Sequence, residues 1–174
     1  MTLLKKIVAL VIGIEFLTAC GSSDVNYDRY SMLDGIPSSA FNYSYMINVD
    51  LYSVLNEGGI VVKTSDVALR PATNHRWADA LDSQLKVITA SELNKRNIKD
   101  NLVVNWAVSK FNGDLAGNVE IEANCIVTKN KKVILNREFS YSSHQTEDGY
   151  QGLVKELRKG WIDIAGKLAA SLSK

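Results

Sequence analysis

One stretch, from Ile60 to Leu93, changes from a strand pattern to a helix pattern and so limits the folds open to the chain. It begins with three β-branched residues at 60–62, which favour a strand. Pro71 donates no backbone hydrogen bond and is predicted to end that strand. Asn74 is the predicted N-cap of the helix that follows. The apolar face predicted for this helix holds Trp77, Leu81, Leu85 and Ile88.

Four further segments are predicted to be strands, and the chain ends in a helix pattern. Alternating apolar residues predict strands over 41–55, 102–108 and 119–127, and the segment 133–142 follows a predicted hairpin turn as the fifth strand. The final helix covers Tyr150–Leu172, with Asp148 as its predicted N-cap, and either packs on the sheet or lies on a membrane surface. Packing is favoured because the sheet needs a cover. The predicted fold is an α/β (α+β) sandwich, in which a mixed five-stranded sheet packs with two helices in the order ββαβββα.

The first twenty residues carry an export signal. Lys5 and Lys6 precede an apolar run at 7–17, which is short for a membrane span. The ending Leu-Thr-Ala-Cys is similar to the lipobox of bacterial lipoproteins, in which the leader is cleaved and the cysteine carries acyl chains such as palmitate. We therefore predict lipidation at Cys20, with an ordinary signal peptide as the alternative. Gly21, in place of Asp, resembles the pattern of lipoproteins sorted to the outer membrane.

This leader divides the chain into three predicted parts. They are a signal peptide at 1–19, a lipidated tether at 20–40 and a single periplasmic domain at 41–174. The leader contains two of the 20 basic and one of the 19 acidic residues, so the remainder is formally neutral. A neutral domain lacks the charge that nucleic-acid binding requires.

Residues suited to catalysis or metal binding do not form a recognisable constellation. His75 and His144 lack a metal-ligand partner at helical or hairpin spacing. Asp79 and Asp82 fit a solvated helix face. Cys125 lies on the apolar side of a strand and is predicted to be a buried small hydrophobe, with a catalytic thiol as the alternative. We therefore expect a non-enzymatic protein without cofactor or metal.

Trp77 has two interpretations. It is either a core residue or an anchor in an interface with another protein. The second interpretation makes the segment that precedes it, which includes Arg70 and Arg76, a candidate interface.

Several segments together resemble the ABC-type transport auxiliary lipoproteins. They are the lipobox, Ile60–Asp66, Trp77–Asp82, Phe111–Gly113 and Asp148–Tyr150. The chain departs from the family pattern at 55–58, where members often carry Pro-x-Tyr-Leu, and at Ala80, where they often carry proline.

The resemblance implies an outer-membrane lipoprotein that faces the periplasm. It would be non-enzymatic and homo-oligomeric, and would dock a periplasmic MCE-domain protein similar to PqiB within an intermembrane lipid transport system that supports envelope integrity. One alternative is a periplasmic lipoprotein that binds a lipid or another small apolar ligand. Another is an envelope hydrolase that uses Cys125 or His144.

Overall fold

The computed structural model describes residues 27–41, 45–98 and 101–173, so the predicted lipidation site Cys20 lies outside it. The described part contains seven strands, two α-helices and two short 3-10 helices. In chain order these are β1 (Asp28–Tyr30), η1 (Ser38–Phe41), β2 (Met46–Leu51), η2 (Ser53–Glu57), β3 (Gly59–Ser65), β4 (Ala68–Trp77), α2 (Leu81–Lys95), β5 (Leu102–Asp114), β6 (Asn118–Lys129), β7 (Lys132–His144) and α3 (Gly149–Leu172).

All seven strands belong to one mixed sheet. Its order is β1-β4-β3-β5-β6-β7, and β2 also pairs with β5. β2 and β3 run parallel to β5 and follow each other along it, because Met46 is in register with Val103 and Val62 with Gly113. The mixed sheet and two helices were predicted correctly, but the number of five strands was wrong.

The largest error concerns the residues between Lys63 and Leu81. The chain turns back after β3 and forms β4, so Asn74 lies inside a strand and Trp77 ends it. Pro71 is tolerated within β4 because β1 pairs only with the last three residues of that strand, from His75 onward. One side of β4 is therefore unpaired at the proline, which is the position that a residue without an amide hydrogen can occupy.

Helix α2 begins later than predicted and without a side-chain N-cap. Ala80 occupies the N-cap position, and the carboxylate of Asp79 accepts a hydrogen bond from its backbone amide at 2.8 Å. The predicted apolar face is otherwise present, since Leu81, Leu85 and Ile88 are buried.

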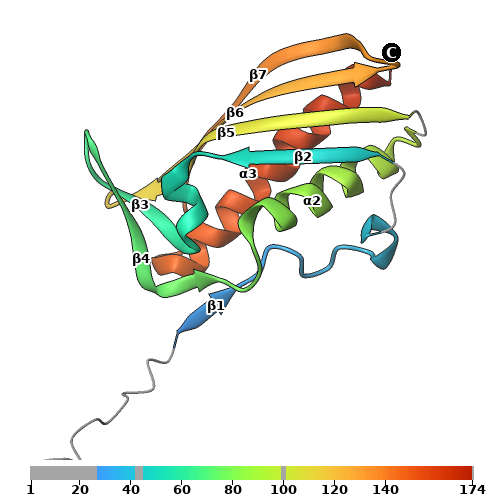
Figure 1. Cartoon of the computed structure of the whole chain (residues 1–174). Coiled ribbons are helices and arrows are strands. Elements are labelled where there is room, and N and C mark those ends of the chain that lie inside the picture. The colour runs from blue at the N-terminus through green and yellow to red at the C-terminus, as the bar shows by residue number, and fades with distance from the viewer. Residues whose placement is uncertain (1–26, 42–44, 99–100, 174) are drawn as a thin grey trace, which may run out of the picture.

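The domain has two layers, with both helices on the same face of the sheet (Figure 1). The core lies between the sheet and the two helices and includes Trp106, Phe111 and Trp161, each at most 1% exposed. The prediction that the last helix packs on the sheet is thus confirmed. Helix α3 approaches the sheet closely at Gly160, where an added Cβ atom would lie 2.5 Å from Tyr141.

Candidate anchoring and docking surfaces

Strand β1 joins the segment that follows the predicted lipidation site to the body of the domain. Asp28, Arg29 and Tyr30 pair in parallel with His75, Arg76 and Trp77 of β4. The amide of Ala78 then donates a hydrogen bond to the Tyr30 carbonyl at 2.8 Å. The described part of the predicted tether is therefore packed onto the domain, and the predicted boundary at residue 41 stays a prediction.

Three residues from distant parts of the chain fix this segment, and we call Met32, Gln84 and Arg158 the anchor clamp. Met32 is fully buried, and its amide donates a hydrogen bond to the Gln84 side-chain oxygen at 2.8 Å. Nε of Arg158 donates to the Met32 carbonyl at 2.8 Å, and Nη2 donates to the Asp34 carbonyl at 2.7 Å. Both polar groups of the Met32 backbone are therefore satisfied by side chains of the two helices.

His75 links the same segment to both β4 and α3. Its ring stacks on Tyr150 with the ring centroids 4.0 Å apart. Its Nδ1 lies 3.1 Å from the Tyr30 hydroxyl and 3.4 Å from a carboxylate oxygen of Asp28. These contacts give His75 a structural role at the point where the chain enters the domain.

The residues of the candidate interface separate into one buried side chain and two accessible ones. Trp77 is 5% exposed and packs against Phe111, with the ring centroids 6.1 Å apart. Arg70 is exposed, while Arg76 is partly buried and donates from Nη2 to the Glu57 carbonyl at 3.0 Å. Trp77 is therefore a core residue in this structure, and the interface role of the two arginines stays a prediction.

The other residues considered for chemistry lie apart from one another. The two ring nitrogens of His144 face the backbone oxygens of Ala116 and Gln145 at 2.8 and 2.9 Å. Cys125 is fully buried in β6, and this burial raises the pKa of its thiol to about 12. Asp82 forms an ion pair with Lys86 at 2.7 Å. Within the described ranges, no group of three or more histidine, cysteine or acidic residues could hold a metal ion.

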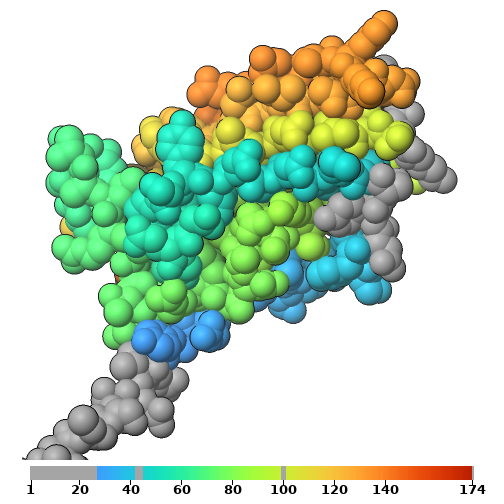
Figure 2. Space-filling model, in the orientation of Figure 1, coloured from blue at the N-terminus to red at the C-terminus, as the bar shows by residue number. Residues whose placement is uncertain are grey.

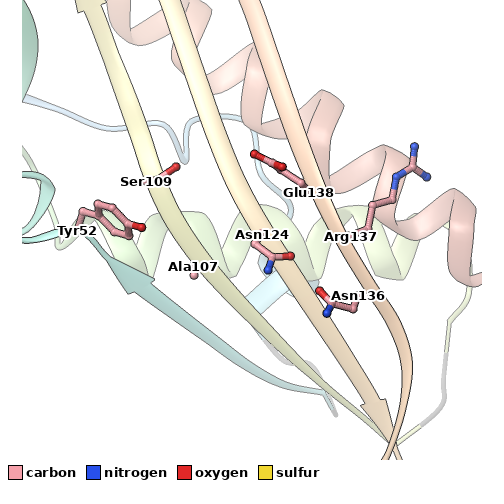
Figure 3. Close-up of a pocket in the computed structure, with 7 residues that line it drawn as sticks. All are labelled: Tyr52, Ala107, Ser109, Asn124, Asn136, Arg137 and Glu138. Carbon is pink, nitrogen blue, oxygen red and sulfur yellow. The ribbon is translucent and has the colours of Figure 1, made fainter.

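The sheet face without helices carries a polar hollow of about 540 Å³. Figure 3 shows most of its lining on the adjacent strands β5, β6 and β7, with Tyr52 on the loop after β2 and the helices behind the sheet. The lining consists of Tyr52, Ala107, Ser109, Asn124, Asn136, Arg137 and Glu138. On the same face, the amide of Asn48 donates to the Asn105 side-chain oxygen at 2.8 Å. Amides, hydroxyls and charges of this kind suit a polar surface and not an acyl chain.

The anchor clamp was not anticipated from the sequence. Gln84 is a polar residue in a helix and gives no sign that it would be completely buried. Met32 and Arg158 are 126 residues apart. Only the completed fold, in which Arg158 of α3 bonds the segment after β1, brings them together, so no local pattern indicates the contact.

A mixed sheet covered on one face, with its first strand fixed beside β4, is the domain of a known class of lipoprotein. Residues 46–169 match the model of the family described as ABC-type transport auxiliary lipoprotein component. The match covers more than half of the chain, so the chain belongs to this family. The resemblance inferred from the sequence is thus confirmed.

Named relatives and solved structures agree with this assignment. The chain is 27% identical to the intermembrane transport lipoprotein PqiC of Escherichia coli K12 over 95% of this chain and 96% of that protein. PqiC of Shigella flexneri gives the same values. One crystal structure, of an uncharacterised protein, has a TM-score of 0.73 at 24% identity and covers 84% of this chain and 99% of the other. A Xanthomonas campestris protein has a TM-score of 0.63 at 13% identity, covering 75% and 84%. These two structures support the fold.

None of the helices in the described residues has the length and apolar character needed to cross a membrane.

Proposed function

We propose that this protein is a non-enzymatic, lipid-anchored component of an intermembrane lipid transport system. Acyl chains on Cys20 hold it on the periplasmic face of the outer membrane. Its domain docks a periplasmic MCE-domain protein of the PqiB type and supports the integrity of the envelope. Several copies associate in this role, and the exposed Arg70 and the partly buried Arg76 contribute to a protein contact.

The anchor clamp is the observation that carries the proposal. A docking protein must transmit force between its lipid anchor and its partner, so the chain behind the anchor has to be fixed to the folded body. Here β1 pairs in parallel with β4, and Arg158 holds the backbone oxygens of Met32 and Asp34. Two acyl chains anchor a protein stably where one does not, which gives such a fixed segment a firm attachment.

Capture of the partner tests the docking role. The full-length protein is purified from membranes of cells that also produce the MCE-domain protein, and co-purification is measured. We expect capture by the wild-type protein and a weaker signal from the Arg70→Glu variant, with Lys131→Glu as the control at an exposed turn. Reproducible absence of the MCE-domain protein, with both proteins present in the membranes, would contradict the proposal.

Lipid anchoring has its own test. Cys20→Ala should abolish incorporation of radiolabelled palmitate and prevent normal maturation, because the acyl acceptor is lost. Cys125→Ala is the matched control and should be labelled like the wild type. Labelling that persists in the Cys20→Ala variant would contradict acylation at Cys20.

The alternative of apolar ligand binding gains no support from the described core. Trp106, Phe111 and Trp161 fill the space between the sheet and helices, and Trp106 and Trp161 contact each other with ring centroids 5.0 Å apart. Native mass spectrometry decides between the two, since a retained lipid would favour the alternative. The same spectra report the number of copies in the assembly.

A further inference from the structure

The end of the β3–β4 hairpin and the neighbouring β5–β6 turn expose aliphatic side chains. Val67 is 96% exposed, Leu115 78% and Leu69 44%, and we call these three residues the apolar tip. The two loops are neighbours, because Lys63 of β3 is in register with Leu69 of β4 on one side and with Asp114 of β5 on the other. Figure 2 shows the hairpin, in green, projecting from the body of the domain.

The apolar tip is unusual for a two-residue hairpin. Such turns favour Gly, Asn and Asp, which suit the backbone of the turn and remain hydrated. In the β6–β7 turn, Asn130 and Lys131 both have a positive φ, the backbone conformation that two-residue hairpins favour. The β3–β4 turn instead places Val67 in solvent at a position where neither turn residue has a positive φ. Exposed apolar residues that gather in one place can mark a contact surface, and the strand register places these three at the same end of the sheet.

The length of the chain before β1 determines whether the predicted anchor and the apolar tip can reach one surface. Asp28 is in register with His75, and β1 runs parallel to β4. Cys20 lies eight residues before Asp28, and Val67 lies eight residues before His75. Eight residues span at most about 26–29 Å when extended, and eight residues of a strand rise by about 26 Å. The acylated cysteine and the apolar tip can therefore reach the same plane.

We propose that the apolar tip rests on the phospholipid bilayer and forms a second, protein-based membrane contact beside the acyl anchor. This inference rests on the proposed lipidation of Cys20. The bilayer is favoured over a protein partner because the anchor keeps lipid within reach at a high effective concentration. Val67, Leu69 and Leu115 enter the boundary between headgroups and acyl chains, while Lys63 and Asp66 stay at headgroup level. The domain then stands with its β3–β4 end toward the membrane and its β6–β7 turn, which Figure 1 places at the opposite end, away from it.

Fluorescence of a single labelled position tests this orientation. Acylated full-length protein carrying Val67→Cys is labelled with a polarity-sensitive dye and reconstituted in vesicles of phosphatidylethanolamine and phosphatidylglycerol, some of which contain lipid-borne nitroxide quencher. Lys131→Cys, in the β6–β7 turn, is the matched control, and the buried Cys125 stays unlabelled. We expect a blue shift and quenching by the nitroxide lipid at position 67, and neither at position 131.

A second variant separates lipid contact from an effect of the dye. Adding Leu115→Asp to the labelled Val67→Cys protein should reduce the quenching, while Val133→Asp, at an exposed aliphatic residue of the other end, should not. Equal polarity at positions 67 and 131, in protein that floats with the vesicles, would overturn this inference alone. A blue shift without quenching would overturn it in favour of a protein contact. Protein that fails to float with the vesicles would overturn the proposed anchoring as well.

Discussion

Arg158 in the last helix donates a hydrogen bond from Nε to the backbone oxygen of Met32 at 2.8 Å. This contact joins the C-terminal helix to the first strand region, 126 residues earlier in the chain. It fixes the segment behind the predicted anchor to an element that packs across the sheet. The rigidity of the segment around Met32 therefore depends on its contact with α3 as well as on the strand pairing of β1.

We expect Arg158→Ala to loosen the residues around Met32 more than the rest of the domain. The change removes two charge-assisted hydrogen bonds, and the expected loss in the free energy of unfolding is about 1–3 kcal/mol. Hydrogen exchange of the Met32 amide should accelerate in the variant. Lys155→Ala, on the same helix as Arg158, is the control, because it breaks an exposed ion pair with Glu147, which precedes that helix, and such pairs contribute at most about 1 kcal/mol. Unchanged exchange at Met32 in Arg158→Ala would contradict the role of the clamp.

Substitution of Trp77 tests whether this residue stabilises the core or anchors an interface. Trp77→Ala should lower the free energy of unfolding by about 3–5 kcal/mol, because a large buried side chain is lost. Chemical denaturation of the isolated protein measures this directly. Arg70→Glu is the matched change on the exposed side of the same strand and should stay within about 0.5 kcal/mol of the wild type. A Trp77→Ala variant with wild-type stability but no partner capture would instead make Trp77 an interface anchor.

Local patterns predicted the elements that bury one regular face. In β6, Val119, Ile121, Ala123, Cys125 and Val127 alternate in the sequence and are all buried. The same reasoning located α3, whose apolar side chains recur at helical spacing. These elements follow from the sequence because each packs one face against one neighbouring layer.

The errors lie where contacts between distant residues decide the structure. Asn74 has the chemistry of an N-cap, but the pairing of β4 with both β3 and β1 keeps it extended. The strand predicted over 102–108 continues to Asp114 in β5, because Gly113 pairs with Val119 on one side and Val62 on the other. The clamp formed by Gln84 and Arg158 depends in the same way on the completed fold.

Cys125 should resist thiol reagents in the folded protein. Burial raises the pKa of its thiol to about 12, so the reactive thiolate is scarce near neutral pH. Addition of a disulfide reagent to the native protein should give slow labelling that becomes complete on denaturation. The Cys125→Ala variant supplies the baseline for any other reaction of the reagent. Fast stoichiometric labelling of the native protein near neutral pH would revive the catalytic-thiol alternative.

Glu156 should make the stability of the domain sensitive to acid. It is 6% exposed, although glutamate is rarely buried unless it is paired. Burial alone would raise the pKa of this carboxyl, but hydrogen bonds from Lys159, Tyr141 and Ser143 outweigh it and lower the pKa below its ordinary 4.5. The ionised group therefore stabilises the fold above that value, and the contribution is lost as the pH falls through the lowered pKa.

Denaturation curves should show that Glu156→Gln is less stable than the wild type near neutral pH and loses less stability from about pH 5 to about pH 3. Glu147→Gln, at an exposed carboxylate, should keep the wild-type profile, and a wild-type profile for Glu156→Gln would contradict this account.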